Sequence, residues 1–571
     1  GRMSKELLQL NRMKTTLTAY SVVQHPLHFD LCEIDRKLIL GMILVGFGSL
    51  ALGVFLGLLQ AFNYAGVGLY QFFPGLKSYY HGLTLHGVLN GFVFPFAASN
   101  GFLSLTTIRG LGLRMPPFLL FLSLFSLIVG TGLSFYGILF GNSAVLYTFY
   151  VPMRAHWSFY VGIAFLVIST WAISLAQLVT LRKWKKEHPT DRIPLLAYAS
   201  ILTYIMWDIS SIGAAVEDLF LLLPWSLNLL PGSDATLTRT LFWFTGHPIV
   251  YFWLLPVYVS WYFCLPAQVG AKLYSDLMVR SVFVAFLILV PVGFHHQYAD
   301  PGIGLFYKWA AAVLTFGIAF PSLVTAFSVV YSLEMGGLSR GGKGIFGWVK
   351  QLPWKDPSVC AQILAGLAFL PGGMTGIMHA SVNMDLLLHN TSFLPGHFHL
   401  TVGAAVALSL VGIAYWLVPY LTGKKLWGRS VARWQPWIYF FGVLIFSSGQ
   451  MSGGVLGMPR RTALALIPYE PLAGWKISGT LTAIGGSLMF LSFLIFFFVM
   501  IMTILFGLKE RQADMPIAQL IHGPSLKGSQ LIFDKISYWV LLCFALIALL
   551  YGPFLITHLP PKLICQPFQG F

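Results

Sequence analysis

The chain has 571 residues, of which 57% are hydrophobic and only 9% charged, and its net charge is +16. A soluble domain carries about 25% charged residues, so this composition excludes a soluble globular enzyme and a disordered chain. The positive charge does not indicate a nucleic-acid binder, because the Lys and Arg residues are spread over short segments between apolar runs.

Apolar runs dominate the chain from residue 38 onward. Each is long enough for a membrane span, which needs about 20 apolar residues, and together they predict an all-α, polytopic membrane bundle. The thirteen expected spans are 38–62, 79–103, 116–140, 157–181, 195–223, 240–266, 278–298, 309–333, 358–379, 396–421, 435–456, 478–507 and 536–557. We expect residues 1–37 to form a cytoplasmic N-terminal segment, 38–557 one transmembrane domain and 558–571 an outer C-terminal tail.

The loops between these runs differ in basic charge. The N-terminus and every second loop after it hold 27 of the 35 Lys and Arg residues. Basic residues are retained on the cytoplasmic side of a membrane. The N-terminus is therefore predicted inside and, because the number of spans is odd, the C-terminus outside.

Histidines are the unusual polar component of the expected spans. Six lie inside spans or at their ends: His86, His247, His295, His296, His397 and His399. On the predicted topology all six lie in the outer third of the bilayer, although they belong to four helices. Ionisable side chains are costly in a membrane and are functional candidates by default. A single one is more simply a buried histidine bonded to a carbonyl, but six at one depth predict a metal site, and imidazole suits iron, copper and zinc.

The two histidines of the tenth expected span point to opposite sides. His397 and His399 are two residues apart, so their side chains lie about 200° apart on a helix. They cannot bind one metal together, but they can bind two metals on opposite faces. His86 would then pair with one of them across a six-coordinate cofactor such as haem.

The other three histidines can converge on one ion. His295 and His296 are adjacent, about 100° apart on a helix. With His247 they would form a three-histidine site with an open coordination position, the layout of a reactive metal centre. Tyr251 follows His247 by four residues and lies on the same helical face. Its phenol is predicted to point toward the same metal, in a redox or proton-donating role.

Polar side chains continue from Tyr251 toward the inner side. The set comprises Tyr258 and Tyr262 on the same helix, Ser322, Thr325 and Ser328 on the eighth expected span, and Ser275 at the inner loop. Ser and Thr in membrane helices often bond only to the preceding turn. Because these side chains start at the expected metal site, we interpret them as a proton path.

Four short motifs together resemble those of the haem–copper oxygen reductases. Residues 243–251 (WFTGHPIVY) resemble the sixth-helix signature of that superfamily, and residues 83–87 (LTLHG) resemble its low-spin haem motif. Residues 293–297 (GFHHQ) and 395–399 (PGHFH) also match. The resemblance extends from about residue 25 to the last expected span.

The resemblance implies a role for each histidine. His86 and His399 would be the axial ligands of a low-spin haem b, and His397 the proximal ligand of a high-spin haem of a-type or a variant. The ligands of one copper ion facing the high-spin haem would be His247, His295 and His296.

Tyr251 would be covalently linked to His247 and would supply an electron and a proton when the O–O bond is cleaved. Phe398 would lie between the two haems.

Further polar groups are expected near the haem propionates at the outer side. The family places arginines there, and Arg pairs well with carboxylates, so Arg460 and Arg461 are assigned to this role. Asp385 and His389 would lie near the propionates of the high-spin haem, where protons could leave. His379 has no partner pattern and is not predicted to function.

Two departures narrow the subfamily. The A-type pattern has Glu where this chain has Ile249, and it has a Lys on the eighth helix where residues 321–325 read PSLVT. Both differences resemble the B-type cytochrome c oxidases, in which one channel is believed to carry chemical and pumped protons.

The resemblance implies subunit I of a terminal oxidase in a prokaryotic plasma membrane. It would reduce O2 to water with four electrons, coupled to proton uptake and pumping. The five cysteines show no paired spacing, so a dinuclear copper centre would belong to a partner subunit II if cytochrome c is the donor. A quinol donor and a further small single-helix subunit are compatible with the sequence. The alternatives are a nitric oxide reductase, which lacks the tyrosine, and a non-redox transporter with histidine proton relays.

Overall fold

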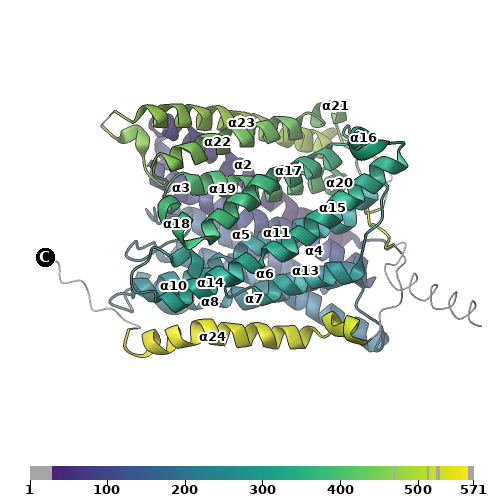
Figure 1. Ribbon diagram of the computed structural model, residues 1–571, viewed down its shortest axis with the longest axis horizontal. Helices are drawn as coiled ribbons and strands as arrows, with labels where there is room; N and C mark the ends of the chain where they lie inside the picture. The colour runs from purple at the N-terminus through teal and green to yellow at the C-terminus, as the bar shows by residue number, and fades with distance from the viewer. Residues whose placement is uncertain (1–28, 469, 511–513, 522–527, 563–571) are drawn as a thin grey trace, which may run out of the picture.

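The structure of the protein is a computed structural model, and it describes residues 29–468, 470–510, 514–521 and 528–562. These residues are nearly all helical, and among them the only β-type pairings are three isolated bridges. Figure 1 shows long helices that run side by side across the molecule. The predicted all-α membrane bundle is confirmed.

Twelve helical stretches of the described chain are long and apolar enough to cross a membrane. They are α2 (Glu33–Tyr64), α3–η3–α4 (Tyr79–Leu111), α5 (Pro117–Leu139), α6 (Trp157–Glu187), α7–α8–η4–α9 (Leu195–Ser226), α10–α11–η5–α12 (Ala235–Val269), α14–α15 (Leu305–Ser339), α17 (Pro357–Ala380), α19–η7–α20 (Phe393–Thr422), α21–α22 (Arg429–Val455), α23 (Ala473–Phe506) and α24 (Ile536–Lys562).

The segment expected to span at 278–298 is irregular. Its helix α13 (Asp276–Ile288) has only 13 residues, and a turn connects it to the short 3₁₀ helix η6 (Gly293–Gln297). Pro291 lies in that turn, and proline cannot donate the hydrogen bond that would continue the helix. The regular helix is therefore shorter than predicted. Twelve of the thirteen expected spans therefore correspond to candidate membrane helices of the described chain, and the segment 278–298 does not.

Four spans contain a π-helical segment: η3 (Leu89–Val93), η4 (Glu217–Leu222), η5 (Ser260–Cys264) and η7 (His399–Val406). Such segments are rare and occur frequently at functional sites. Here η3 begins three residues after His86, and η7 begins at His399. The interruptions therefore coincide with two of the six histidines.

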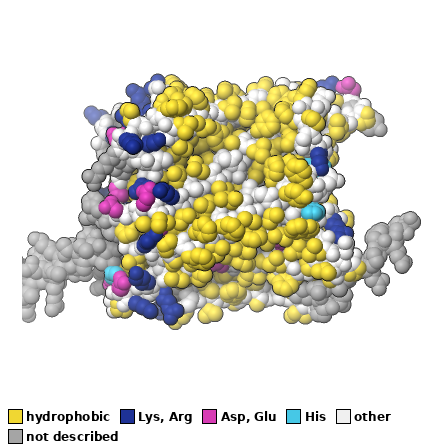
Figure 2. Space-filling view, turned by 180° about the vertical axis from the view of Figure 1, so that it is seen from behind, with side chains coloured by type: hydrophobic (Ala, Val, Ile, Leu, Met, Phe, Trp, Pro, Cys, Tyr) yellow, Lys and Arg dark blue, Asp and Glu magenta, His cyan; other side chains and the backbone are white. Residues whose placement is uncertain are grey.

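Charge and polarity are distributed as a membrane protein requires. On the face drawn in Figure 2, hydrophobic side chains cover a broad band, and most of the Lys and Arg side chains lie at one end of the molecule. This is the asymmetry that retention of basic residues on the cytoplasmic side produces.

Buried hydrogen bonds join the helices around the site. The Tyr204 hydroxyl donates to the side-chain carbonyl of Asn100 at 2.7 Å, and the amide of Asn100 donates to Ser123 at 3.1 Å. Interhelical hydrogen bonds of this kind stabilise membrane bundles, where the hydrophobic effect between helices is weak.

Candidate metal centre

Three histidines from two separate segments converge in the interior. One ring nitrogen of each of His247, His295 and His296 lies within 4.8 Å of the others. The Nδ1 of His247 is 2.9 Å from the Nε2 of His296. Two nitrogens bound to one tetrahedral ion at about 2 Å are separated by about 3 Å, so the three side chains fit a single metal ion. The structure thus brings together the set that the sequence predicts.

Local backbone features place these histidines. His247 lies at the break between α10 (Ala235–Gly246) and α11 (Pro248–Val259), because Pro248 interrupts the hydrogen-bond ladder. The Trp243 indole stacks on the His296 ring with centroids 3.8 Å apart. Trp243 Nε1 donates to the Tyr150 hydroxyl at 2.7 Å. Sequence reasoning missed Trp243 as a support for a histidine ligand.

Tyr251 lies against the same group. Its hydroxyl is 3.0 Å from the Nε2 of His247, and only 2% of its surface is exposed. His247 therefore presents Nδ1 to the histidine group and Nε2 to the tyrosine. This arrangement follows from the i, i+4 spacing on one helical face.

His86 and His399 form a second arrangement. Their rings face each other with centroids 6.5 Å apart and planes inclined by 16°. The Nδ1 of His86 bonds the Gly53 carbonyl at 2.7 Å, and the Nδ1 of His399 bonds the Pro395 carbonyl at 2.7 Å. Both Nε2 atoms remain available. Two metal–nitrogen bonds of about 2 Å plus half of each ring span about 6 Å, so the pair fits a metal between the rings.

His397 belongs to neither group. Its Nδ1 is 2.8 Å from the Thr375 hydroxyl on α17, which leaves Nε2 available. Its neighbour Phe398 packs on His399 with ring centroids 5.1 Å apart. The two histidines of this helix therefore have different partners, as their spacing predicts.

Glycines leave room beside these rings. A Cβ added at Gly57 would lie 3.0 Å from Cε1 of His86, and one at Gly376 would lie 3.2 Å from Cε1 of His397. Both contacts are tighter than ordinary van der Waals separation. The two glycines therefore let the imidazoles of His86 and His397 lie where they do, with Nε2 free to bind iron, as in haem proteins.

Asp385 lies on the short helix α18 (Val382–Leu388), and its carboxylate contacts two histidines. It accepts a hydrogen bond from His379 Nδ1 at 2.9 Å, and His389 Nδ1 is 3.4 Å away. Burial by itself would raise the pKa of Asp385, but the hydrogen bonds of His379 and His389 lower that pKa below its ordinary value. The expectation that His379 has no partner is wrong, because its partner lies beyond the end of its own helix.

Arg460 and Arg461 also lie at this end of the molecule. Arg460 donates to the Asn390 side chain at 3.2 Å, but its Nε is buried without a hydrogen bond among the described residues. Burial and the neighbouring Arg461 lower the pKa of Arg460 to about 10. The environment of Arg460 therefore fits a carboxylate partner that none of the described residues supplies.

The predicted polar path is partly connected. Thr325 donates to the Pro321 carbonyl at 2.8 Å and accepts from the Tyr262 hydroxyl at 2.7 Å. Ser322 and Thr325 lie close to the buried Tyr258 hydroxyl, and Ser328 is buried on the same helix. Ser275 caps the start of α13 by accepting from the Met278 amide.

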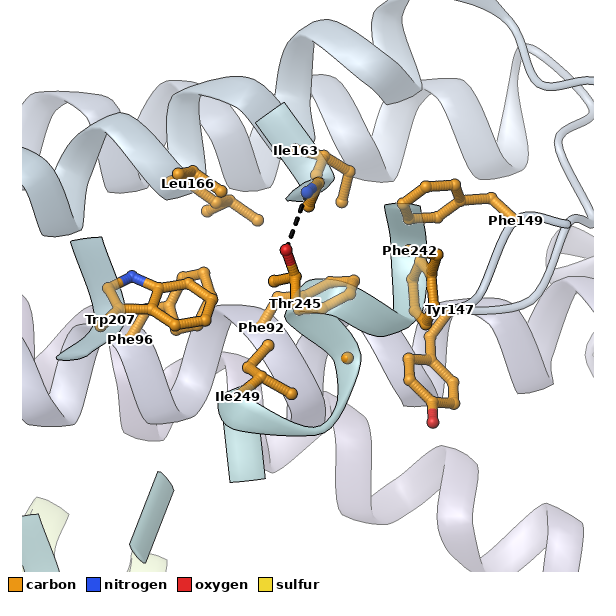
Figure 3. A pocket seen from close by; sticks show the side chains of 13 residues that line it. Phe92, Phe96, Tyr147, Phe149, Ile163, Leu166, Trp207, Phe242, Thr245 and Ile249 are labelled. Carbon is orange, nitrogen blue, oxygen red and sulfur yellow. Dashed lines mark hydrogen bonds between the residues drawn. The ribbon is translucent and has the colours of Figure 1, made fainter. Parts of the chain in front are cut away.

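An apolar cavity is lined in part by Gly246 and Ile249, which flank His247 in the sequence. Figure 3 shows Ile163 and Leu166 on one side of it, with Thr245 and Ile249 on the other. The Thr245 hydroxyl accepts from the Ala214 amide and donates to the Ser210 carbonyl, both at 2.7 Å. Because that hydroxyl is already bonded, the cavity suits a small apolar molecule.

Comparisons with known proteins agree with this geometry. A family model described as "Cytochrome C and Quinol oxidase polypeptide I" matches residues 37–487. "Cytochrome c oxidase subunit 1" of Thermus thermophilus is 40% identical over 542 residues, which cover 92% of this chain and 96% of the relative. "Probable quinol oxidase subunit 1" of Staphylococcus epidermidis is 26% identical over 377 residues, which cover 62% of this chain and 52% of the relative. A solved structure of a haem–copper terminal oxidase dimer superposes with a TM-score of 0.87 at 35% identity, covering 92% of each chain.

Proposed function

The chain belongs to the cytochrome c and quinol oxidase polypeptide I family, and we propose that it is the catalytic subunit of a terminal respiratory oxidase that reduces O2 to water. The observation that carries this proposal is the three-part division of the histidines. One facing pair, one single histidine and one convergent trio meet the ligand needs of two haems and one copper ion.

The chain's own side chains would hold these groups as follows. His86 and His399 hold a low-spin haem b, and His397 holds a high-spin haem of a-type or a variant. The copper ligands are His247, His295 and His296. When bound, the haems and the copper supply the electron transfer that O2 reduction requires.

Tyr251 supplies a proton and an electron during O–O cleavage. Its hydroxyl is in contact with the His247 nitrogen that faces away from the metal position. That nitrogen is free to form a bond to a carbon of the Tyr251 ring. Formation of this bond removes the ring hydrogen and the nitrogen hydrogen as two protons and two electrons, and O2 is the oxidant that accepts the electrons.

Protons reach Tyr251 from the inner side through one path of hydroxyl groups. The hydrogen bond between Tyr262 and Thr325 is its best-defined step. Ser275 would mark the inner entrance, with Ser322 and Ser328 along the wall. Ile249 stands where the A-type pattern has Glu, and residues 321–325 (PSLVT) stand where it has a Lys on the eighth helix, so we assign the chain to the B-type oxidases with one channel for chemical and pumped protons.

The outer side chains and the apolar cavity have separate roles. Arg460 and Arg461 pair with haem propionates, and Asp385 and His389 lie near the proton exit. O2, which is small and apolar, approaches His247 through the cavity shown in Figure 3.

Electrons enter from a partner. The proposed assembly contains a subunit II with a dinuclear copper centre that accepts electrons from cytochrome c, in a prokaryotic plasma membrane. A quinol donor is the alternative, and a small single-helix subunit is compatible with the assembly. Assays of O2 uptake with reduced cytochrome c and with quinol distinguish the two donors.

The test uses the purified complex. A reduced-minus-oxidised spectrum, its change with CO, and metal counts should give two haem irons per complex, with three coppers if subunit II carries the dinuclear centre and one copper if it does not. Extra iron in place of copper would indicate a nitric oxide reductase, and a colourless folded protein would indicate a transporter. The Tyr251→Phe variant should keep both haem bands and lose turnover; normal O2 uptake by this variant would refute the role of Tyr251.

A further inference from the structure

His295 and His296 are not carried by a regular helix. They lie on the five-residue helix η6, after the turn that ends α13. A segment of this kind has few backbone hydrogen bonds to hold it in place. Its position must therefore be determined by the side chains that pack around it.

One side of η6 is held by its neighbour in the candidate site. The indole of Trp243 stacks on His296, and the Trp243 carbonyl lies directly against Gly293, where a Cβ would collide with it. Glycine is therefore required at 293 by the close approach of the two backbones.

The other side of η6 faces α24, the helix at the edge of the bundle in Figure 1. α24 packs mainly against α13 and α10. Most of its surface is exposed, but Cys543, Leu550, Tyr551 and Phe554 are buried. Leu550 and Tyr551 follow Cys543 by seven and eight residues, and Phe554 follows them by four and three, so the four side chains form one stripe along the helix. The outer end of that stripe meets η6.

Aromatic contacts join the two elements. Tyr551 stacks on Phe294 with centroids 4.6 Å apart and planes inclined by 21°. Phe554 meets the same ring edge-on at 5.9 Å, and Tyr551 meets Phe244 of α10 edge-on at 4.8 Å. The Tyr551 hydroxyl would lie 2.6 Å from a Cβ at Gly293. These residues form a small hydrophobic cluster that is separate from the main core.

We propose that Tyr551 is a positioning residue for the three-histidine metal group. It holds Gly293 and Phe294 against α10, so that the next two residues, His295 and His296, face His247. The segment is thus clamped between Trp243 and Tyr551. This inference rests on the proposed function, because it assumes that the trio binds copper.

If Tyr551 positions the trio, its loss should affect the copper group alone, whereas a general packing role would not single out that group. Tyr551 touches the segment that carries two ligands of the trio, and the described structure gives it no contact with His86 or His399. Loss of the Tyr551 ring should therefore disturb copper and leave the low-spin haem unchanged. Supporting groups behind metal ligands typically change metal affinity by about 10- to 100-fold.

The experiment uses the purified holoenzyme and three variants at position 551. Tyr551→Ala removes the ring, Tyr551→Leu keeps an apolar side chain in case the alanine variant does not accumulate, and Tyr551→Phe keeps the ring. The control is Tyr538→Ala, which removes the same ring from an exposed position near the inner end of α24. The readouts are release to a chelator of the copper held by the trio, counted per low-spin haem after subtraction of any copper from the dinuclear centre of subunit II, and the infrared band of CO bound to the trio's copper after photolysis.

We expect Tyr551→Ala and Tyr551→Leu to release copper about tenfold faster and to shift or broaden the CO band. Tyr551→Phe and Tyr538→Ala should match the wild type, and the low-spin haem band should be unchanged in all four. Wild-type copper release and CO bands in Tyr551→Ala or Tyr551→Leu would overturn the inference. Absence of copper from the wild-type enzyme would instead refute the proposed function.

Discussion

The hydrogen bond between Thr375 and His397 should set the reduction potential of the high-spin haem. The Thr375 hydroxyl donates to the Pro371 and Gly372 carbonyls, both at 2.9 Å, so it can only accept from the His397 Nδ1–H. An acceptor on Nδ1 makes the imidazole a stronger donor to a metal on Nε2. That stabilises the oxidised iron and lowers its reduction potential.

The Thr375→Val variant removes the acceptor with little change in volume. A hydrogen bond of this type contributes about 0.5–1.5 kcal/mol. With about 1.4 kcal/mol and about 59 mV for each tenfold change in a one-electron equilibrium, the potential should rise by about 20–60 mV. The sign is positive because the oxidised form loses the stronger ligand.

The assay is a spectroelectrochemical titration of the purified enzyme, followed at the high-spin haem band. Thr375→Ser keeps the hydroxyl and should stay near the wild-type potential. Thr401→Val removes a hydroxyl that bonds only backbone carbonyls of its own helix, and it controls for the loss of a nearby polar group. A Thr375→Val potential equal to or below the wild-type value would refute the reasoning.

Three further substitutions test other parts of the site. His86→Ala removes one of the two facing rings, so the low-spin haem band should disappear while high-spin haem and copper remain; a spectrum that retains both bands would contradict the assignment. Thr325→Val breaks the hydrogen bond with Tyr262. If that bond contributes about 0.5–1.5 kcal/mol to the barrier, proton uptake measured by flow-flash kinetics should slow by about 2- to 10-fold, whereas Thr325→Ser should keep the wild-type rate; unchanged uptake in Thr325→Val would exclude Thr325 from the path. Ile163→Trp fills part of the cavity in Figure 3. An increase of about 1.4 kcal/mol in the barrier to O2 entry would slow O2 binding about tenfold. A wild-type binding rate would show that O2 takes another route.

Spacing along the chain predicted the arrangement of most of the site. A separation of two residues placed His397 and His399 toward different partners, and a separation of four placed His247 and Tyr251 in contact. These predictions succeed because helical geometry fixes relative direction within one element. The sequence also predicted that His247 converges with His295 and His296, because the predicted topology places both segments at the same depth of the membrane.

The parts that spacing could not predict depend on contacts between different structural elements. His379 meets Asp385 across the end of α17, and Tyr551 meets Phe294 from a helix more than 250 residues away in sequence. No periodic pattern encodes either contact. The irregular end of α13 was missed because its residues are apolar enough to resemble a regular span, although Pro291 and Gly293 indicate the interruption.

The choice of ligand nitrogen links these local contacts to the proposed chemistry. In His86, His397 and His399 a hydrogen bond engages Nδ1 and leaves Nε2 for a metal, and in His295 the Thr315 hydroxyl does the same. His247 differs, because its Nδ1 faces His296 while its Nε2 touches Tyr251. If His247 offered Nε2 rather than Nδ1 to the proposed metal, the contact with Tyr251 would be lost. The break at Pro248, which turns His247 toward η6, is therefore what allows one imidazole to serve both the metal and the tyrosine.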